Sequence, residues 1–142
     1  MTSLVRIRDA SALAVMLSTA AFPFAAVSGE ELGALTGDWA GTSVCVANHD
    51  PCRDEKALYH LTGPNERKLV SVAGSKIVDG REIVMGPPLD FAYDAEKNML
   101  VCETRAGVFR FTVNGSTLEG TLTLISGELY RRISLKKIAK AG

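Results

Sequence analysis

Hydrophobic and polar residues alternate with a period of two along most of the chain beyond residue 36. In "TLEGTLTL", residues 117–124, Leu118, Leu122 and Leu124 share one face while threonines and Glu119 take the other. Successive side chains of an extended strand point to opposite faces, so this pattern predicts a strand with one apolar and one polar side. The segments "VFRFTV" and "LDFAYD" follow the same rule.

Turn residues divide this alternating region into short strands. Asn114–Gly115 and Asp79–Gly80 are dipeptides that supply the positive φ angles of two-residue hairpin turns. Before the first strand, "EELGA" offers one helical turn. We expect eight or nine strands from ten short segments, of which the two beside Gly74 can form one bent strand. Their approximate ranges are 37–46, 54–62, 67–73, 76–79, 81–86, 89–94, 99–104, 108–113, 117–125 and 129–137.

The short connections between these strands determine the expected fold. Strands joined by tight turns are antiparallel neighbours, because a parallel pair needs a crossover of about a dozen residues or more. A meander with one apolar face buries that face best by curling on itself, which also removes exposed edges. The sequence therefore predicts an all-β fold, an antiparallel up-and-down meander of about eight strands closed into a small barrel, as a single domain over residues 29–142.

The N-terminal segment reads as a targeting signal. Arg6 and Arg8 precede an uncharged, alanine-rich run from residue 10 to residue 29, and small residues near Ser28 suit signal peptidase. We expect a cleaved secretory signal over residues 1–28 and a secreted or periplasmic protein that meets a membrane only during export. The alternative is an uncleaved membrane anchor.

Composition and charge are those of an ordinary globular domain. The chain is 46% hydrophobic and 23% charged. Without Arg6, Arg8 and Asp9, the 16 basic and 16 acidic residues become 14 and 15, a net charge of −1. Nucleic-acid binding rests on many Lys and Arg contacts to phosphates, so a near-neutral domain gives it no support. We expect a monomer with no nucleic-acid partner.

The three cysteines predict one disulfide and one free thiol in an oxidising compartment. Cys45 and Cys52 flank "VANHDP", whose Asn, Asp and Pro favour a turn, so a bond across the first hairpin is geometrically easy. The rival is a bond from Cys102 to one of these two. A ring this short stabilises a domain by about 2–3 kcal/mol.

The stretch "LTGDWAGT", residues 35–42, resembles the Gly-x-Trp start of the calycin group of barrels, through Gly37 and Trp39. That group includes lipocalins, avidins and small periplasmic inhibitors of secreted metalloproteases. The resemblance implies that Trp39 lies at the closed end of a barrel and that a basic residue of the last strand packs across it. The middle-loop motif of lipocalins and the several ligand-binding tryptophans of avidins are missing from this sequence.

Alternation on the last strand selects Arg131 as that basic residue. Leu129, Arg131, Ile133 and Leu135 fall on one face, so Arg131 and not Arg132 points inward. A guanidinium over an indole gains about 0.5–2 kcal/mol when partly desolvated. The alternative is that Trp39 is an ordinary core aromatic and Arg131 extends to water.

Candidate catalytic and metal chemistry is weak. A set of potential zinc ligands occurs in the first hairpin, but its spacing matches no zinc pattern and its thiols favour a disulfide. His60 alternates with Tyr59, which predicts an outward-facing surface histidine. We expect no catalytic residue, metal or cofactor. The potential ligands are Cys45, His49, Asp50, Cys52 and Asp54.

Two surfaces are candidates for binding. Inward aromatic residues either line a cup for a small apolar ligand or fill the barrel, and about 110 residues favour filling. The segment "SKIVDGREIVMGPP" mixes charge with Ile83, Val84 and Met85, as a protein-contact loop does, although covering the barrel end explains it equally. We expect a non-catalytic binding protein: a protein-interaction or inhibitor-like module, also using loop 47–53, or alternatively a small-ligand carrier, with a hydrolase as the weakest alternative. The candidate lining residues are Tyr59, Phe91, Tyr93, Phe109 and Phe111.

Overall fold

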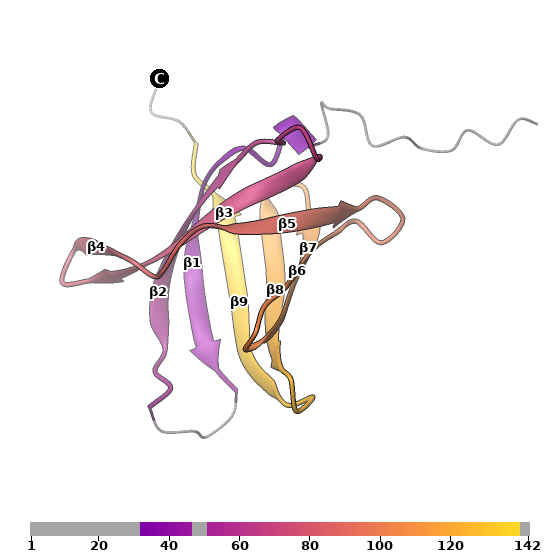
Figure 1. The fold of residues 1–142 in the computed structure, drawn as a ribbon. Coiled ribbons are helices and arrows are strands. Elements are labelled where there is room, and N and C mark those ends of the chain that lie inside the picture. Colours follow the sequence, from indigo (N-terminus) through magenta and orange to yellow (C-terminus); the bar gives the residue numbers. More distant parts are fainter. Residues whose placement is uncertain (1–31, 47–50, 140–142) are drawn as a thin grey trace, which may run out of the picture.

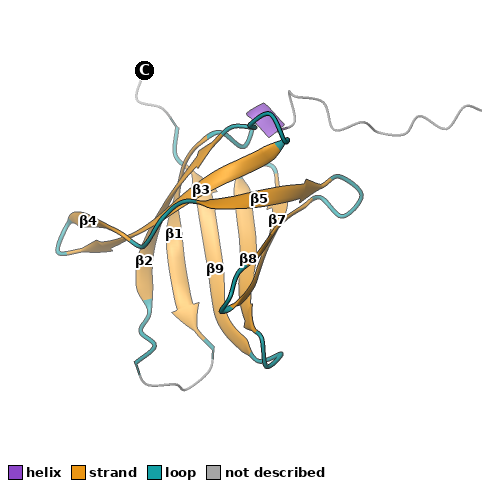
Figure 2. Ribbon diagram, viewed as in Figure 1, coloured by secondary structure: helices purple, strands orange, loops and turns teal. Residues whose placement is uncertain are grey.

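A computed structural model describes residues 32–46 and 51–139, which form nine antiparallel strands and one short helical turn at residues 32–35 (Figures 1 and 2). The expected signal segment, the start of the mature chain, His49 and Asp50 lie outside the described residues. The strands are β1 (Gly37–Cys45), β2 (Glu55–Thr62), β3 (Leu69–Val78), β4 (Arg81–Val84), β5 (Leu89–Asp94), β6 (Met99–Glu103), β7 (Gly107–Asn114), β8 (Thr117–Leu124) and β9 (Leu129–Lys137).

Eight of the strands close into a small barrel, as the alternation predicted. The order around the sheet is β2-β1-β9-β8-β7-β6-β5-β3, and pairing of β2 with β3 completes the ring. Every pairing is antiparallel. Because β1 pairs with β9, the two ends of the strand sequence lie side by side in the wall (Figure 1).

The ninth strand, β4, leaves the barrel wall. The two pieces beside Gly74 form one long strand, β3, which pairs with β2 over most of its length. On its other edge β3 pairs first with β5, through residues 69–72, and then with β4, through residues 75–78. The β3–β4 hairpin, turning at Asp79–Gly80 with positive φ at both residues, therefore projects sideways from the barrel (Figure 1).

One end of the barrel is closed by the helical turn and Trp39. Leu32, Leu35 and Trp39 are all buried, and the indole nitrogen of Trp39 donates a hydrogen bond to the Leu35 carbonyl at 2.9 Å. The ammonium group of Lys137, at the end of β9, lies 5.9 Å from the Trp39 ring centre and donates to the Ala34 carbonyl at 2.6 Å. A cation over the indole and two hydrogen bonds thus fasten the turn across this end.

The first and last strands approach very closely at Gly41. A Cβ atom on Gly41 would lie 1.8 Å from the carbonyl oxygen of Ser134 on β9. No side chain fits at that distance, so the β1–β9 pairing requires glycine here.

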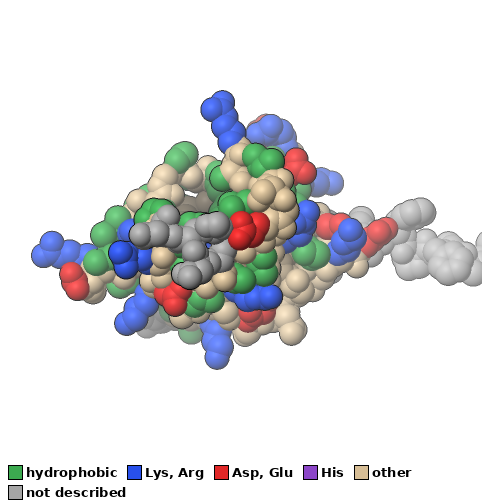
Figure 3. Space-filling view, turned by 90° about the horizontal axis from the view of Figure 1, so that it is seen from below, with side chains coloured by type: hydrophobic (Ala, Val, Ile, Leu, Met, Phe, Trp, Pro, Cys, Tyr) green, Lys and Arg blue, Asp and Glu red, His purple; other side chains and the backbone are tan. Residues whose placement is uncertain are grey.

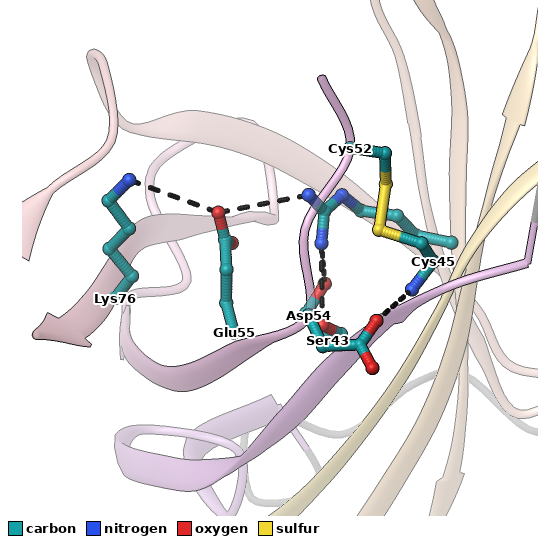
Figure 4. Close-up of a disulfide and its surroundings, with 7 residues drawn as sticks. Ser43, Cys45, Cys52, Asp54, Glu55 and Lys76 are labelled. Carbon is teal, nitrogen blue, oxygen red and sulfur yellow. Dashed lines mark hydrogen bonds and ion pairs between the residues drawn. A yellow bond between two sulfur atoms is a disulfide. The ribbon is translucent and has the colours of Figure 1, made fainter. Parts of the chain in front are cut away.

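At the opposite end of β1, the Cys45–Cys52 disulfide joins the start and finish of the first connection, as predicted. The Cys45 amide also donates to the Asp54 carboxylate at 2.8 Å (Figure 4). Cys102 is a free and buried thiol on β6, so it does not form the rival bond.

Replacing Gly41 by alanine tests the close approach of β1 and β9. The added methyl group forces the strands apart, and we expect a loss of about 3 kcal/mol in the free energy of unfolding, measured by urea denaturation. Gly33→Ala is the matched control, because a Cβ there meets nothing within 4 Å. Equal stability of the two variants would contradict this account of barrel closure.

Candidate binding site

A cavity of about 230 Å³ occupies the half of the barrel opposite the Trp39 end. Its walls are mainly apolar and aromatic, with a polar group of side chains on one side. We call this cavity the cup. Its lining residues are Ser43, Glu55, Tyr59, Val72, Gly74, Met85, Pro87, Leu89, Phe91, Phe109, Leu122, Arg131 and Ile133.

The barrel interior is therefore packed at one end and hollow at the other, so the filling that the chain length favoured holds for only one half of the barrel. At the closed end large residues such as Trp39, Leu61 and Phe111 occupy the inward positions. Toward the open end, inward positions of β1 and β3 carry the small residues Ser43 and Gly74, which leave space. The size of inward residues on adjacent strands thus determines where the cup lies.

One wall of the cup carries a polar corner made of Ser43, Glu55 and Arg131. The Nη1 atom of Arg131 donates to the side-chain and backbone oxygens of Ser43, at 3.1 and 3.3 Å. Its Nη2 atom lies 3.7 Å from the Glu55 carboxylate, and Lys76 approaches the same carboxylate at 4.0 Å (Figure 4). Glu55 therefore lies between two cations.

Tyr59 lies between the polar corner and the packed half of the barrel. Its ring meets Phe111 edge-on, with centroids 6.1 Å apart, and faces the bare Cα of Gly74. Burial, together with the nearby Glu55 carboxylate and against the opposing charge of Arg131, raises the pKa of Tyr59 to about 12. The phenol therefore remains a neutral hydrogen-bond donor at any physiological pH.

Arg131 points inward as predicted but does not pack on Trp39, so the predicted Trp39–Arg131 pair is wrong. Antiparallel register places Arg131 opposite Cys45 and places Lys137 opposite Trp39. Six residues of strand separate these positions, a distance of about 20 Å. The Arg131 guanidinium lies 5.7 Å from the centre of the Tyr130 ring, and Lys137 occupies the position over the indole.

Three of the five aromatic residues predicted to line a cup do so: Tyr59, Phe91 and Phe109. Phe111 is buried in the packed half, where it contacts Phe91 with centroids 5.6 Å apart. Tyr93 is half-buried, lies outside the cup and donates a hydrogen bond to the Asn98 side chain. Alternation in the sequence predicted which residues point inward. Whether an inward residue lines the cup or belongs to the packed core depends on its position along the barrel axis.

Exposed apolar side chains gather around the open end and on the β3–β4 hairpin, where Figure 3 shows them among charged groups. Val84 is 65% exposed and Ile83 is 44% exposed, while Met85 both reaches solvent and lines the cup. All but one of the described large exposed hydrophobic residues lie there; Ile138 is at the closed end. The open-end and hairpin residues are Val46, Val78, Ile83, Val84, Met85 and Ile125.

His60 faces outward, as predicted, and connects the hairpin to the barrel wall. Its Nδ1 atom lies 2.6 Å from the Asp38 carboxylate on β1, and its Nε2 atom lies 2.5 Å from the Glu82 carboxylate on β4. The hydrogen bonds to Asp38 and Glu82 raise the pKa of His60 above 6.5, and the hydrogen bond from His60 is the main cause that lowers the pKa of Glu82 below 4.5. The sequence alone did not predict these two hydrogen bonds, because Asp38, His60 and Glu82 come from three different strands.

Other site chemistry is limited in the part of the chain that the structure describes. No group of three or more His, Cys, Asp or Glu side chains in residues 32–46 and 51–139 is placed to hold a metal ion. Within the same ranges, no helix has the length and apolar character needed to cross a membrane.

No protein-family model matches the chain, and no curated protein sequence matches it.

The hydrogen bonds of His60 to Asp38 and Glu82 predict that the stability of the protein depends on pH. Folding raises the pKa of His60, so the stability that its charged form contributes is complete below pH 6.5 and is lost as the pH rises through the folded-state pKa. Folding lowers the pKa of Glu82, so the stability that its carboxylate contributes is lost in acid, below pH 4.5. We therefore expect His60→Gln to lower the melting temperature by a few degrees at pH 6 and by less at pH 9, measured by circular dichroism.

Glu82→Gln reproduces this loss, whereas Glu66→Gln, on an exposed loop, leaves the melting temperature unchanged at both pH values. A decrement from His60→Gln that is the same at pH 6 and pH 9 would show that the charged imidazole is not what binds the hairpin.

Proposed function

We propose that this protein is an exported, non-catalytic binding protein that takes a small ligand into the cup. The observation that carries the proposal is the uneven packing of the barrel, closed and filled around Trp39 and hollow at the opposite end. A concave, mainly apolar site with a few convergent polar groups is the usual form of a small-molecule site. The Cys45–Cys52 disulfide is compatible with export to an oxidising compartment.

The volume of the cup limits the size of its ligand. At about 230 Å³ it is smaller than typical pockets for drug-sized molecules, which span roughly 300–1,000 Å³. It is larger than an engineered apolar cavity of about 150 Å³ that holds benzene in another protein. The proposed ligand is therefore one ring with a short chain, or the end of a longer molecule that extends past Met85 and Pro87 into solvent.

We also propose that the barrel is calycin-like. What supports the assignment is the closed end, where Gly37 precedes Trp39 and a cation of the last strand, Lys137, lies over the indole. A Cβ on Gly37 would lie 3.1 Å from the Lys137 side chain, so the glycine makes room for that cation.

Filling the cup tests the ligand proposal. Leu122→Trp, on the inner face of β8, places an indole in the cavity, whereas Thr123→Trp places the same group on the outer face. Native mass spectrometry of protein recovered from a bacterial periplasm is expected to show a bound small molecule in the wild type and in Thr123→Trp, and none in Leu122→Trp. The bare polypeptide mass in all three proteins would count against a carrier.

A protein partner is the second candidate function, favoured by the apolar residues on the projecting hairpin. Ile83 and Val84 expose large side chains on a strand that pairs on one edge with β3 alone. Exposed apolar residues that are grouped in this way commonly mark contact surfaces. Inhibitor-like binding through the hairpin belongs to this candidate.

Paired substitutions on the hairpin test this second candidate. Ile83→Ser with Val84→Ser removes the apolar contact and is expected to abolish cross-linking to a periplasmic partner, read by mass spectrometry. Arg67→Ser with Lys68→Ser, on the β2–β3 loop at the other end of the barrel, is the control and retains the partner. Partners that remain bound to the hairpin variant would remove the reason for this candidate.

A further inference from the structure

The hydrogen-bond donors of the polar corner outnumber the acceptors that they reach. Among the described residues, the Nη1 atom of Arg131 donates to Ser43, but its Nη2 atom has no hydrogen-bond acceptor, since the 3.7 Å separation from Glu55 exceeds a hydrogen-bond length. The Tyr59 hydroxyl also has no hydrogen-bond partner within residues 32–46 and 51–139. Both residues line the cup, and the charges of Glu55 and Arg131 both act on the Tyr59 phenol.

Among the described residues that line the cup, Arg131 is the one cation and Glu55 is the one anion. Lys76, outside that lining, approaches the Glu55 carboxylate at 4.0 Å and so takes part in neutralising it. The Arg131 and Glu55 side chains are only 15% and 19% exposed, so water screens them poorly. An anionic group in the cup can therefore pair with Arg131, while Lys76 partly offsets its repulsion from Glu55.

We infer that the ligand of the cup carries a carboxylate, which binds Arg131 and the Tyr59 hydroxyl while its apolar body lies against Phe91 and Phe109. A carboxylate has two acceptor oxygens and no donor, so it satisfies both free donor groups without adding another. Charge-assisted hydrogen bonds are strongest where water is partly excluded, as it is beside the half-buried Arg131. This inference rests on the proposed ligand-binding function and specifies the ligand class.

Two probes of nearly the same shape separate the charge from the apolar body. 3-Phenylpropionate and 3-phenylpropanamide share the ring and chain, but only the first has a carboxylate. In titrations of the oxidised wild-type protein followed by NMR, we expect the carboxylate to bind about tenfold more tightly than the amide. Arg131→Gln is expected to remove this preference, and Tyr59→Phe to reduce it, while Arg132→Gln, on the outer face of β9, keeps it.

The outcomes test the carboxylate inference and the ligand-binding function separately. Equal binding of both probes overturns the carboxylate inference and leaves a ligand-binding cup, whereas binding of neither probe overturns the proposed function together with the inference. If Arg131→Gln does not fold, the wild-type side-chain N–H resonances of Arg131 still decide the question. They shift on adding 3-phenylpropionate and not on adding the amide if the inference holds, and absence of that difference contradicts it.

Discussion

The pairing of β1 with β9 is the contact on which the rest of the structure depends. It turns a row of hairpins into a ring, and it does so through a backbone approach at Gly41 that leaves no room for a Cβ atom. The same register brings Lys137 to Trp39 at one end and Arg131 to Ser43 at the other. One strand pair therefore positions both the residue that closes the barrel and the residue that gives the cup its charge.

The two halves of the barrel interior differ in what they bury. The packed half buries Trp39, Leu61, Leu118 and Leu135, and burial of apolar area is the main favourable term in folding. The hollow half buries less, and it places a charged side chain beside apolar walls, which costs free energy unless that charge is paired. Arg131 is held by Ser43 and balanced by Glu55, so the polar corner is tolerated within a small domain.

Much of the fold could be predicted from the sequence, because every strand of the barrel has one apolar face and ends at turn residues with a known mechanism. The inward direction of Arg131 and the Cys45–Cys52 bond followed from the same local rules. The partner of Trp39 was missed, although Lys137 lies on the same face as Arg131. In an antiparallel pair the start of one strand lies opposite the end of the other. Trp39, near the start of β1, therefore lies opposite Lys137, at the end of β9. The cup and the hydrogen bonds of His60 depend on contacts between strands that are distant in the sequence, and alternation does not specify such contacts.

The buried position of Cys102 bears on how the chain acquires its covalent bond. Thiol–disulfide reshuffling requires a thiolate that can reach the sulfur it attacks. In the folded barrel, Cys102 lies on the inner face of β6, and burial raises its pKa, so it is neither ionised nor accessible. Once the barrel has closed, the third cysteine cannot exchange with Cys45 or Cys52, and any incorrect pairing must be corrected while the chain is still unfolded.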